Sequence, residues 1–340
     1  MKLEHLQLYV CPESLRPMKL KSGATKPDEE IVSDVLVSET GNEYPIQHGV
    51  PDLTYPRELA EQDEYARSFY DGRAEAYDKN LHLTFKTHRE DEQKVRKQFI
   101  DALELHPDSR VLEVSCGTGR DSEIISQRLG PEGQLCLQDI ASGMLERCRQ
   151  RMAGTSVPTS YCLSNACYLP YADKYFDAVY SFGGLGEFSD IKRSLAEMVR
   201  VCKPGAKVVV GDESMPPWLL ETEFAKILIT TNKQFLAPLP LKELPIEARD
   251  VCLRWVIGGV FYLIEFRVGE GEPDADFDFE IPGPKGGTYR TRYLGQLEGV
   301  TQETKRLAAL ARDKRDVSMH RWLDEVVREA ALRDLEGKPR

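Results

Sequence analysis

Two acidic residues and two glycines near the middle of the chain have the spacing needed to hold an organic ligand by its charged and polar groups. Glu113 lies inside the apolar stretch 111–114. Gly117 and Gly119 follow, and because glycine has no Cβ, the backbone can take positive φ there and let a ligand lie against the chain. Asp139 comes about twenty residues later, the spacing at which an acid from the next parallel strand reaches ribose hydroxyls. Together these residues predict a pocket for a nucleoside-containing ligand, although Asp139 alone could equally be a surface N-cap.

The elements that must position these residues are a buried strand, a tight turn and a helix. Residues 111–121 read V-L-E-V-S-C-G-T-G-R-D, and the apolar spacing after them is helical. Such a turn could serve NAD, FAD or S-adenosylmethionine (SAM). The dinucleotide fingerprint fails because Ser122 occupies its third glycine position. A buried Glu113 needs a cation or a donor, which the ammonium group of SAM would supply, so SAM is favoured.

The same stretch resembles motif I of class I SAM-dependent methyltransferases, which reads hydrophobic–hydrophobic–acid–hydrophobic–Gly-x-Gly-x-Gly, with Ser115 in place of the first glycine. The segment A-S-G-M-L-E-R-C after the strand at 133–140 resembles the family's D-x-S-x-x-M-L. The resemblance implies that Asp139 binds the ribose and that Ile140 and Met144 pack on the adenine. The cofactor-binding residues that the resemblance implies are Glu113, Ser115, Gly117, Thr118, Gly119, Asp139, Ile140, Met144, Asn165, Ala166 and Ser181.

Later segments narrow the resemblance to the ubiquinone/menaquinone methyltransferase branch. Asn165 stands where the family usually has Asp, and its amide oxygen can still accept a hydrogen bond from the adenine amino group. Y-F-D-A-V-Y-S-F at 175–182 matches the fourth strand, and L-A-E-M-V-R-V-C-K-P-G at 195–205 matches L-x-E-x-x-R-V-L-K-P-G-G. The resemblance covers residues 62–270 and implies an α/β fold with a Rossmann-like sheet of seven strands.

The last two strands of that sheet are predicted as an antiparallel hairpin. Residues 254–257 and 260–268 are apolar and β-branched, and Gly258-Gly259 joins them with a tight turn. This hairpin would close the sheet after the strand that contains V-V-V-G-D-E-S. A further helix is predicted to begin at Pro216-Pro217-Trp218.

Methyl transfer from SAM needs little covalent catalysis by the protein, because the sulfonium is already a strong electrophile. The protein aligns the acceptor and excludes water, and a base is needed only when the acceptor starts protonated. Y-A-R-S-F-Y-D-G-R-A-E-A-Y-D at 65–78 resembles the family segment whose aromatic residues cover the cofactor and the substrate mouth. Its other interpretation is a packed amphipathic helix. The candidate catalytic residues are Tyr70, Tyr77, Glu187 and Asp212, with Trp218 as a substrate wall.

Residues 1–56 predict a small β-rich module. They resemble the zinc-ribbon domain that serves as a methyltransferase activator or precedes some methyltransferases. Cys11 is kept, but Ser14, Val37 and Thr40 occupy the other three ligand positions. One thiolate cannot hold zinc, which takes about four nitrogen or sulfur ligands. We therefore expect a ribbon fold without a metal, an unrelated hairpin being the alternative.

The C-terminal part differs in composition from the rest of the chain. Residues 271–287 are rich in Gly, Pro and Asp and predict a linker. Residues 288–340 predict a strand over T-Y-R-T-R-Y-L-G-Q-L and two helices, the second capped by Ser318. This order resembles ribbon-helix-helix modules, which are intertwined dimers and often bind DNA. Homodimerisation or partner docking through the tail is favoured over packing on the catalytic domain and over DNA phosphate contacts by Arg290 and Arg292.

The composition of the chain limits the classes of function that it can have. The chain has 340 residues, 41% of them hydrophobic, and a net charge of -11, which argues against nucleic-acid binding by the whole surface. No run approaches the roughly 18 apolar residues of a membrane helix, no signal peptide is seen, and eight scattered cysteines fit reduced thiols in the cytoplasm. We expect a cytoplasmic methyltransferase that acts on a small molecule and releases S-adenosylhomocysteine. The alternatives are methylation of ribosomal-type RNA and a non-catalytic SAM-binding regulator that uses the tail.

Overall fold

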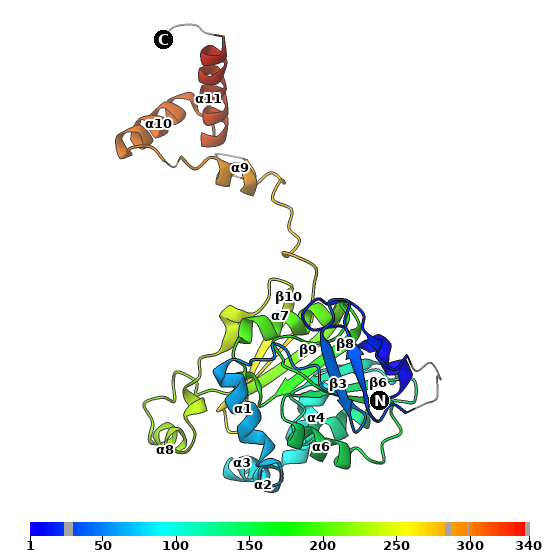
Figure 1. The fold of residues 1–340 in the computed structure, drawn as a ribbon. Helices are drawn as coiled ribbons and strands as arrows, with labels where there is room; N and C mark the ends of the chain where they lie inside the picture. The colour runs from blue at the N-terminus through cyan, green and yellow to red at the C-terminus, as the bar shows by residue number, and fades with distance from the viewer. Residues whose placement is uncertain (24–29, 283–286, 298, 337–340) are drawn as a thin grey trace. The chain divides into compact units, whose positions relative to one another are not determined.

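The apolar stretches of residues 110–268 form one seven-stranded sheet in the computed structural model (Figure 1). Its order is β10-β11-β9-β8-β5-β6-β7, with β11 antiparallel to both neighbours and the other pairs parallel. The predicted α/β sheet and its closing hairpin are therefore confirmed. The strands are β5 (Arg110–Val114), β6 (Gln134–Asp139), β7 (Thr159–Leu163), β8 (Phe176–Phe182), β9 (Cys202–Glu213), β10 (Ala248–Val256) and β11 (Phe261–Val268).

The structure describes residues 1–23, 30–282, 287–297 and 299–336, which divide into two units, Met1–Pro273 and Asp274–Arg340. Within those ranges, no helix has the length and apolar character that crossing a bilayer would require. The first unit contains the sheet, the helices around it and the N-terminal module (Figure 1).

Side chains of the strands alternate between the two faces of the sheet, and each face has its own buried cluster. Leu112 and Val114 pack on the face shared with the N-terminal module, while Val111 packs on the other. Burying each such side chain contributes about 1.5–3 kcal/mol. The carboxyl end of β5 is thereby held firmly at the centre of the unit.

Among the described residues, four α-helices precede β5 and four lie between its end and the hairpin. Their ends follow local capping: Asp190 caps α7 by accepting a hydrogen bond from the Arg193 N–H at 2.9 Å. The helix predicted from Pro216 begins only at Glu223, because the Thr222 hydroxyl provides the cap. The helices are α1 (Glu61–Asp71), α2 (Ala74–Asn80), α3 (His82–Thr87), α4 (Glu92–Asp101), α5 (Arg120–Ser126), α6 (Ser142–Arg151), α7 (Ile191–Val201) and α8 (Glu223–Thr231).

The N-terminal module is β-rich as predicted. It is an antiparallel sheet of β1 (Lys19–Leu20), β2 (Asp34–Val37), β3 (Glu43–Gln47) and β4 (Val50–Pro51). It packs on the seven-stranded sheet, where the Leu53 N–H donates to the Leu163 carbonyl at 2.8 Å, beside the outer edge of β7.

Cys11 is the only one of the four predicted zinc-ligand positions that is a cysteine, and its surroundings bear on the prediction of a metal-free ribbon. Cys11 is buried, and its Sγ lies 3.5 Å from the Tyr44 hydroxyl of β3. Thr40 lies in the turn that joins β2 and β3, where its hydroxyl pairs with Ser38 at 2.9 Å. The likeness to a zinc ribbon stays a prediction.

The tail unit is helical, with α9 (Tyr289–Leu294), α10 (Gln302–Arg315) and α11 (Met319–Leu335). The cap of α11 by Ser318 is confirmed. The strand predicted at its start was wrong, because Thr288 and Thr291 form a capping box that begins α9. Of the residues described in this unit, Ala308 alone is buried. Dimerisation through the tail stays a prediction.

Candidate active site

The turn after β5 adopts the backbone conformation that its glycines allow. Gly117 has φ 54° and Gly119, which begins α5, has φ 80°. A Cβ at position 119 would lie 2.7 Å from Cys148 Sγ of α6 and 3.2 Å from Cys148 Cα, so glycine is required for α5 and α6 to pack. A Cβ at position 117 would meet nothing within 4 Å. The two glycines therefore serve different purposes.

This difference gives a paired prediction. We expect Gly119→Ala to lower the free energy of unfolding by about 2–4 kcal/mol, from left-handed strain plus overpacking against Cys148. Gly117→Ala should cost only the strain, about 1–2 kcal/mol, while its methyl group occupies ligand space and weakens SAM binding. Chemical denaturation and calorimetry on both variants check this. Unchanged SAM affinity in Gly117→Ala would remove this turn from the cofactor site.

Asp139, at the end of β6, holds the turn in place and lines the pocket above it. Its Oδ2 accepts a hydrogen bond from the Gly117 N–H at 2.8 Å and its Oδ1 accepts one from the Ala141 N–H at 2.9 Å. Burial nevertheless raises the pKa of Asp139 to about 6, against these two hydrogen bonds, which lower it. The carboxylate is thus fixed in orientation and titrates near neutral pH.

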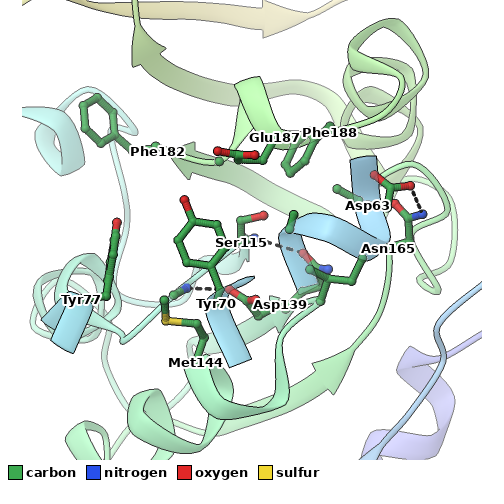
Figure 2. A pocket seen from close by; sticks show the side chains of 17 residues that line it. Asp63, Tyr70, Tyr77, Ser115, Asp139, Met144, Asn165, Phe182, Glu187 and Phe188 are labelled. Atoms are coloured by element: carbon green, nitrogen blue, oxygen red, sulfur yellow. Dashed lines mark hydrogen bonds between the residues drawn. The ribbon is translucent and has the colours of Figure 1, made fainter. Parts of the chain in front are cut away.

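A pocket lies at the carboxyl ends of the central strands and encloses about 710 Å³ of space between atoms, its open mouth included (Figure 2). Most of the predicted site residues come together around it. Those that line it are Tyr70, Tyr77, Ser115, Gly117, Asp139, Ile140, Met144, Asn165, Ala166 and Glu187.

Four predicted cofactor residues lie outside this lining. The buried Glu113 accepts a hydrogen bond from the Ser122 hydroxyl at 2.5 Å, and burial together with the charge of Asp121 raises its pKa well above the usual range. Gly119 packs on α6, as described above. Thr118 donates to Asp78 at 2.9 Å, and the buried Ser181 hydroxyl has no hydrogen-bond partner among the described residues. Direct contacts of these four with a cofactor stay predictions.

Asp63 of α1 is a pocket residue that sequence reasoning missed. It is 4% exposed and accepts hydrogen bonds from the Ser189 N–H, the Ser189 hydroxyl and Asn165 Nδ2 at 2.9, 2.7 and 2.9 Å (Figure 2). Asn165 Oδ1 in turn accepts from the Cys167 N–H at 2.9 Å. A carboxylate only accepts and a backbone N–H only donates, so the Asn165 amide can take just one orientation.

Two further aspartates pin the aromatic helices α1 and α2 over the pocket. Asp71 accepts a hydrogen bond from the Gly143 N–H at the start of α6 at 2.8 Å. Asp78 accepts from Arg120 and from Arg151 at 2.9 and 2.8 Å, besides its bond from Thr118. These bonds explain why the segment 61–80 stays against the sheet while its tyrosines face the pocket.

A second cavity adjoins the pocket, and we call it the acceptor cavity. It encloses about 1180 Å³ of space between atoms, again with its open mouth included. Phe182, Gly183 and Glu187 line both spaces, as do the two tyrosines, whose rings meet edge to face with centroids 5.7 Å apart. The predicted Asp212 lines this cavity and not the first pocket. Trp218 lines neither; it is 68% exposed and its ring centroid lies 5.9 Å from that of Trp255.

Three carboxylates of the acceptor cavity are held by hydrogen bonds. Asp212 accepts from the Gly186 and Glu213 N–H groups at 2.6 and 2.9 Å. Glu187 accepts from Gln234 Nε2 at 3.1 Å. Glu213 was not predicted; burial, with the charges of Asp212 and Glu187, raises its pKa well above the usual range. Its signal in the sequence is its position beside Asp212 at the end of a buried strand.

Residues 59–226 are similar in sequence to known methyltransferases. The model of the ubiE/COQ5 methyltransferase family matches residues 59–226. Demethylmenaquinone methyltransferase of Symbiobacterium thermophilum is 31% identical over 163 residues, 47% of this chain and 64% of that protein. Ubiquinone/menaquinone biosynthesis C-methyltransferase UbiE of Bordetella parapertussis is 34% identical over 163 residues, 47% of this chain and 58% of that protein. The chain thus spans about three fifths of the length of these curated relatives.

Among solved structures, phosphoethanolamine N-methyltransferase 2 of Haemonchus contortus, in complex with S-adenosyl-L-methionine, superposes with a TM-score of 0.46 at 12% identity. The superposition covers 65% of this chain and 62% of that one. The sequence match rests on the segment that carries the glycine turn, Asp139, Asn165 and Glu187. Residues 59–226 therefore match the ubiE/COQ5 methyltransferase family, and over this stretch the chain is similar to SAM-dependent methyltransferases.

Proposed function

We propose that this protein transfers the methyl group of SAM to a small-molecule acceptor bound in the acceptor cavity. The observation that carries the proposal is the shared wall: five residues line both the pocket beside Asp139 and the cavity beside Asp212. A methyl donor in the first space and an acceptor in the second would meet at this wall. The family match of residues 59–226 supports the same chemistry.

The residues of the pocket fit SAM. Asp139 offers carboxylate oxygens to the ribose hydroxyls, and Ile140 and Met144 offer apolar surface to the adenine. Asp63 and Asn165 form a polar group at the same pocket, with one N–H and one oxygen lone pair of the amide still available. When bound, SAM supplies an electrophilic methyl group.

The side chains of the chain itself position the acceptor and handle its proton. Tyr70 and Tyr77 cover the shared wall, which keeps water from the methyl group. In Figure 2 the Tyr70 hydroxyl points toward Glu187 across the pocket. Glu187, Asp212 and Glu213 are the carboxylates available to take a proton from the acceptor.

The test is a search for the product. Purified protein and SAM carrying a ¹³C-labelled methyl group are added to a metabolite extract, and mass spectrometry looks for compounds that gain one labelled methyl group. We expect at least one such compound, and its loss in Asp139→Ala. Quinols are included because the names of both curated relatives refer to quinone biosynthesis.

The competing functions are tested in parallel. Total RNA replaces the metabolite extract in one arm, and label in RNA but in no small molecule would overturn the proposal in favour of RNA methylation. In another arm, genomic DNA fragments are assayed by gel shift with and without SAM. SAM-dependent DNA binding without methyl transfer would instead indicate a regulator.

A further inference from the structure

We propose that the acceptor is a positively charged amine, so that methyl transfer is directed to nitrogen. This inference rests on the proposed SAM-dependent activity and names the substrate class of its acceptor cavity. It depends on three features of that cavity: its charge, its aromatic walls and the means of removing a proton.

The acceptor cavity carries negative charge that the described residues do not neutralise. Glu187, Asp212 and Glu213 line it, and within the described ranges no Lys, Arg or His lies within ion-pair distance of any of the three. Arg96 also lines the cavity, but it is bound by Glu92 at 2.9 Å and by Asp121 at 2.7 Å. Charges in a confined site need a partner, and an ammonium group would supply one.

Aromatic rings surround the same space. Phe69, Tyr70, Tyr77, Phe182 and Phe261 line the cavity, and they come from α1, α2, β8 and β11. Ring faces attract cations, and sites that recognise ammonium groups combine several rings with carboxylates. Figure 2 draws the lining of the first pocket and shows Tyr70, Tyr77, Phe182 and Glu187, which also line this cavity. The walls therefore favour a cation over an equally large neutral molecule.

A phenolic acceptor fits this cavity less well. Attack by a phenol on SAM develops phenolate character, and that negative charge would arise beside three carboxylates. An amine has the opposite requirement, because it enters as an ammonium and must lose one proton before it attacks. Glu187 and Asp212 line the cavity, and their carboxylates are available to receive that proton.

The step balances with the groups named. An ammonium acceptor gives one proton to a carboxylate of the cavity, and the nitrogen lone pair then forms the N–CH₃ bond. The S–CH₃ bond breaks with its electron pair remaining on sulfur, which leaves neutral S-adenosylhomocysteine. The methylated nitrogen is again a cation, held by Asp212 and Glu187 until release.

The test follows the label. In the metabolite experiment, ¹³C NMR of the labelled product identifies the atom that carries the methyl group. A label on nitrogen supports the inference, whereas a label on carbon or on phenolic oxygen overturns it and leaves the proposed function standing. Absence of any labelled small molecule, with SAM still bound, overturns the proposed function instead.

A binding measurement tests the inference without turnover. Calorimetry on the full chain loaded with S-adenosylhomocysteine compares phenethylamine with 2-phenylethanol, which has the same carbon skeleton without the charge. We expect the amine to bind at least about tenfold more tightly. Equal affinity for the two probes would overturn the inference.

Single-residue variants test whether the amine binds at the carboxylates of the cavity. Glu213→Gln and Glu187→Gln should each reduce phenethylamine affinity about tenfold. Glu213 lies outside the lining of the SAM pocket, so Glu213→Gln should leave SAM affinity within about threefold. Glu221→Gln, which alters an exposed carboxylate just before α8, is the matched control and should change neither affinity. If the control and the two cavity variants behave alike, the cavity does not bind the amine.

Discussion

Replacing Asn165 by Asp is expected to weaken SAM binding about tenfold to a hundredfold. The change sets a second carboxylate where Asn165 Nδ2 now lies 2.9 Å from Asp63 Oδ2. It removes a hydrogen bond to a charged acceptor, worth about 1.5–3 kcal/mol, and replaces it by repulsion between like charges. Two such carboxylates bind a proton between them, so affinity should partly return as the pH is lowered.

The reciprocal change shows that the pair acts as a unit. Asp63→Asn alone forces two donors to face each other, at Asn165, at the Ser189 N–H or at the Cys167 N–H, whichever way either amide turns. The double variant Asp63→Asn with Asn165→Asp exchanges the two groups and restores the pairing between them, with the Ser189 hydroxyl now accepting where it had donated. We expect the double variant to bind SAM within about threefold of the original chain.

Calorimetry and thermal denaturation on the four chains make this a double-mutant cycle. Restored affinity together with restored stability supports the pair as part of the cofactor site. If stability follows the cycle while SAM affinity stays constant throughout, the pair only joins α1 to the loop after β7.

Asp139→Ala is expected to weaken SAM binding by about 1–3 kcal/mol, through lost charge-assisted hydrogen bonds to the ribose. Asp177→Ala is the matched control, since Asp177 also accepts a backbone hydrogen bond, from the Arg110 N–H at 2.9 Å, but at the opposite end of β5. The control should leave SAM affinity unchanged in calorimetry. Unchanged affinity in Asp139→Ala would remove this residue from the ribose.

The pKa of Asp139 adds a dependence on pH. Ribose hydroxyls bind the ionised carboxylate, so SAM affinity should rise as the pH increases through about 6, and Asp139→Ala should flatten that rise. The contribution of Asp139 to folding stability depends on pH in the opposite direction. Because the folded pKa exceeds the ordinary value of 3.8, the group's contribution to stability is full below pH 3.8 and is lost as the pH rises through about 6. Bound SAM offsets that loss, so its stabilising effect should be larger at pH 8 than at pH 5.

The parts of the fold that could be predicted are those that adjacent residues determine. The glycine turn, the acid at the end of β6 and the hairpin at Gly258-Gly259 each depend on a few consecutive positions. The tail shows where this fails: its alternating Tyr and Arg residues favour a strand, yet the hydroxyls of Thr288 and Thr291 cap a helix there. A local hydrogen bond outweighed a weak propensity.

The candidate site could be predicted only in part. Asp63 and Asn165 are 102 positions apart, and no local pattern relates them. The buried Glu113 was predicted to need a cation or a donor, and in the structure the Ser122 hydroxyl donates a hydrogen bond to it. In the sequence, Ser122 was informative only because it replaces the third glycine of the dinucleotide fingerprint. Tertiary contacts of this kind lie beyond what spacing along one chain can indicate.

The bond between Leu53 and Leu163 has a consequence for solubility. A terminal strand of a sheet presents unpaired N–H and C=O groups that invite another chain to add itself, and proteins shield such strands to avoid intermolecular stacking. Here the amino-terminal module provides the shield. A shortened protein without its first 56 residues would keep every residue that lines the two cavities, but the edge of β7 would be exposed. We expect such a protein to lose activity through aggregation and not through the loss of a site residue.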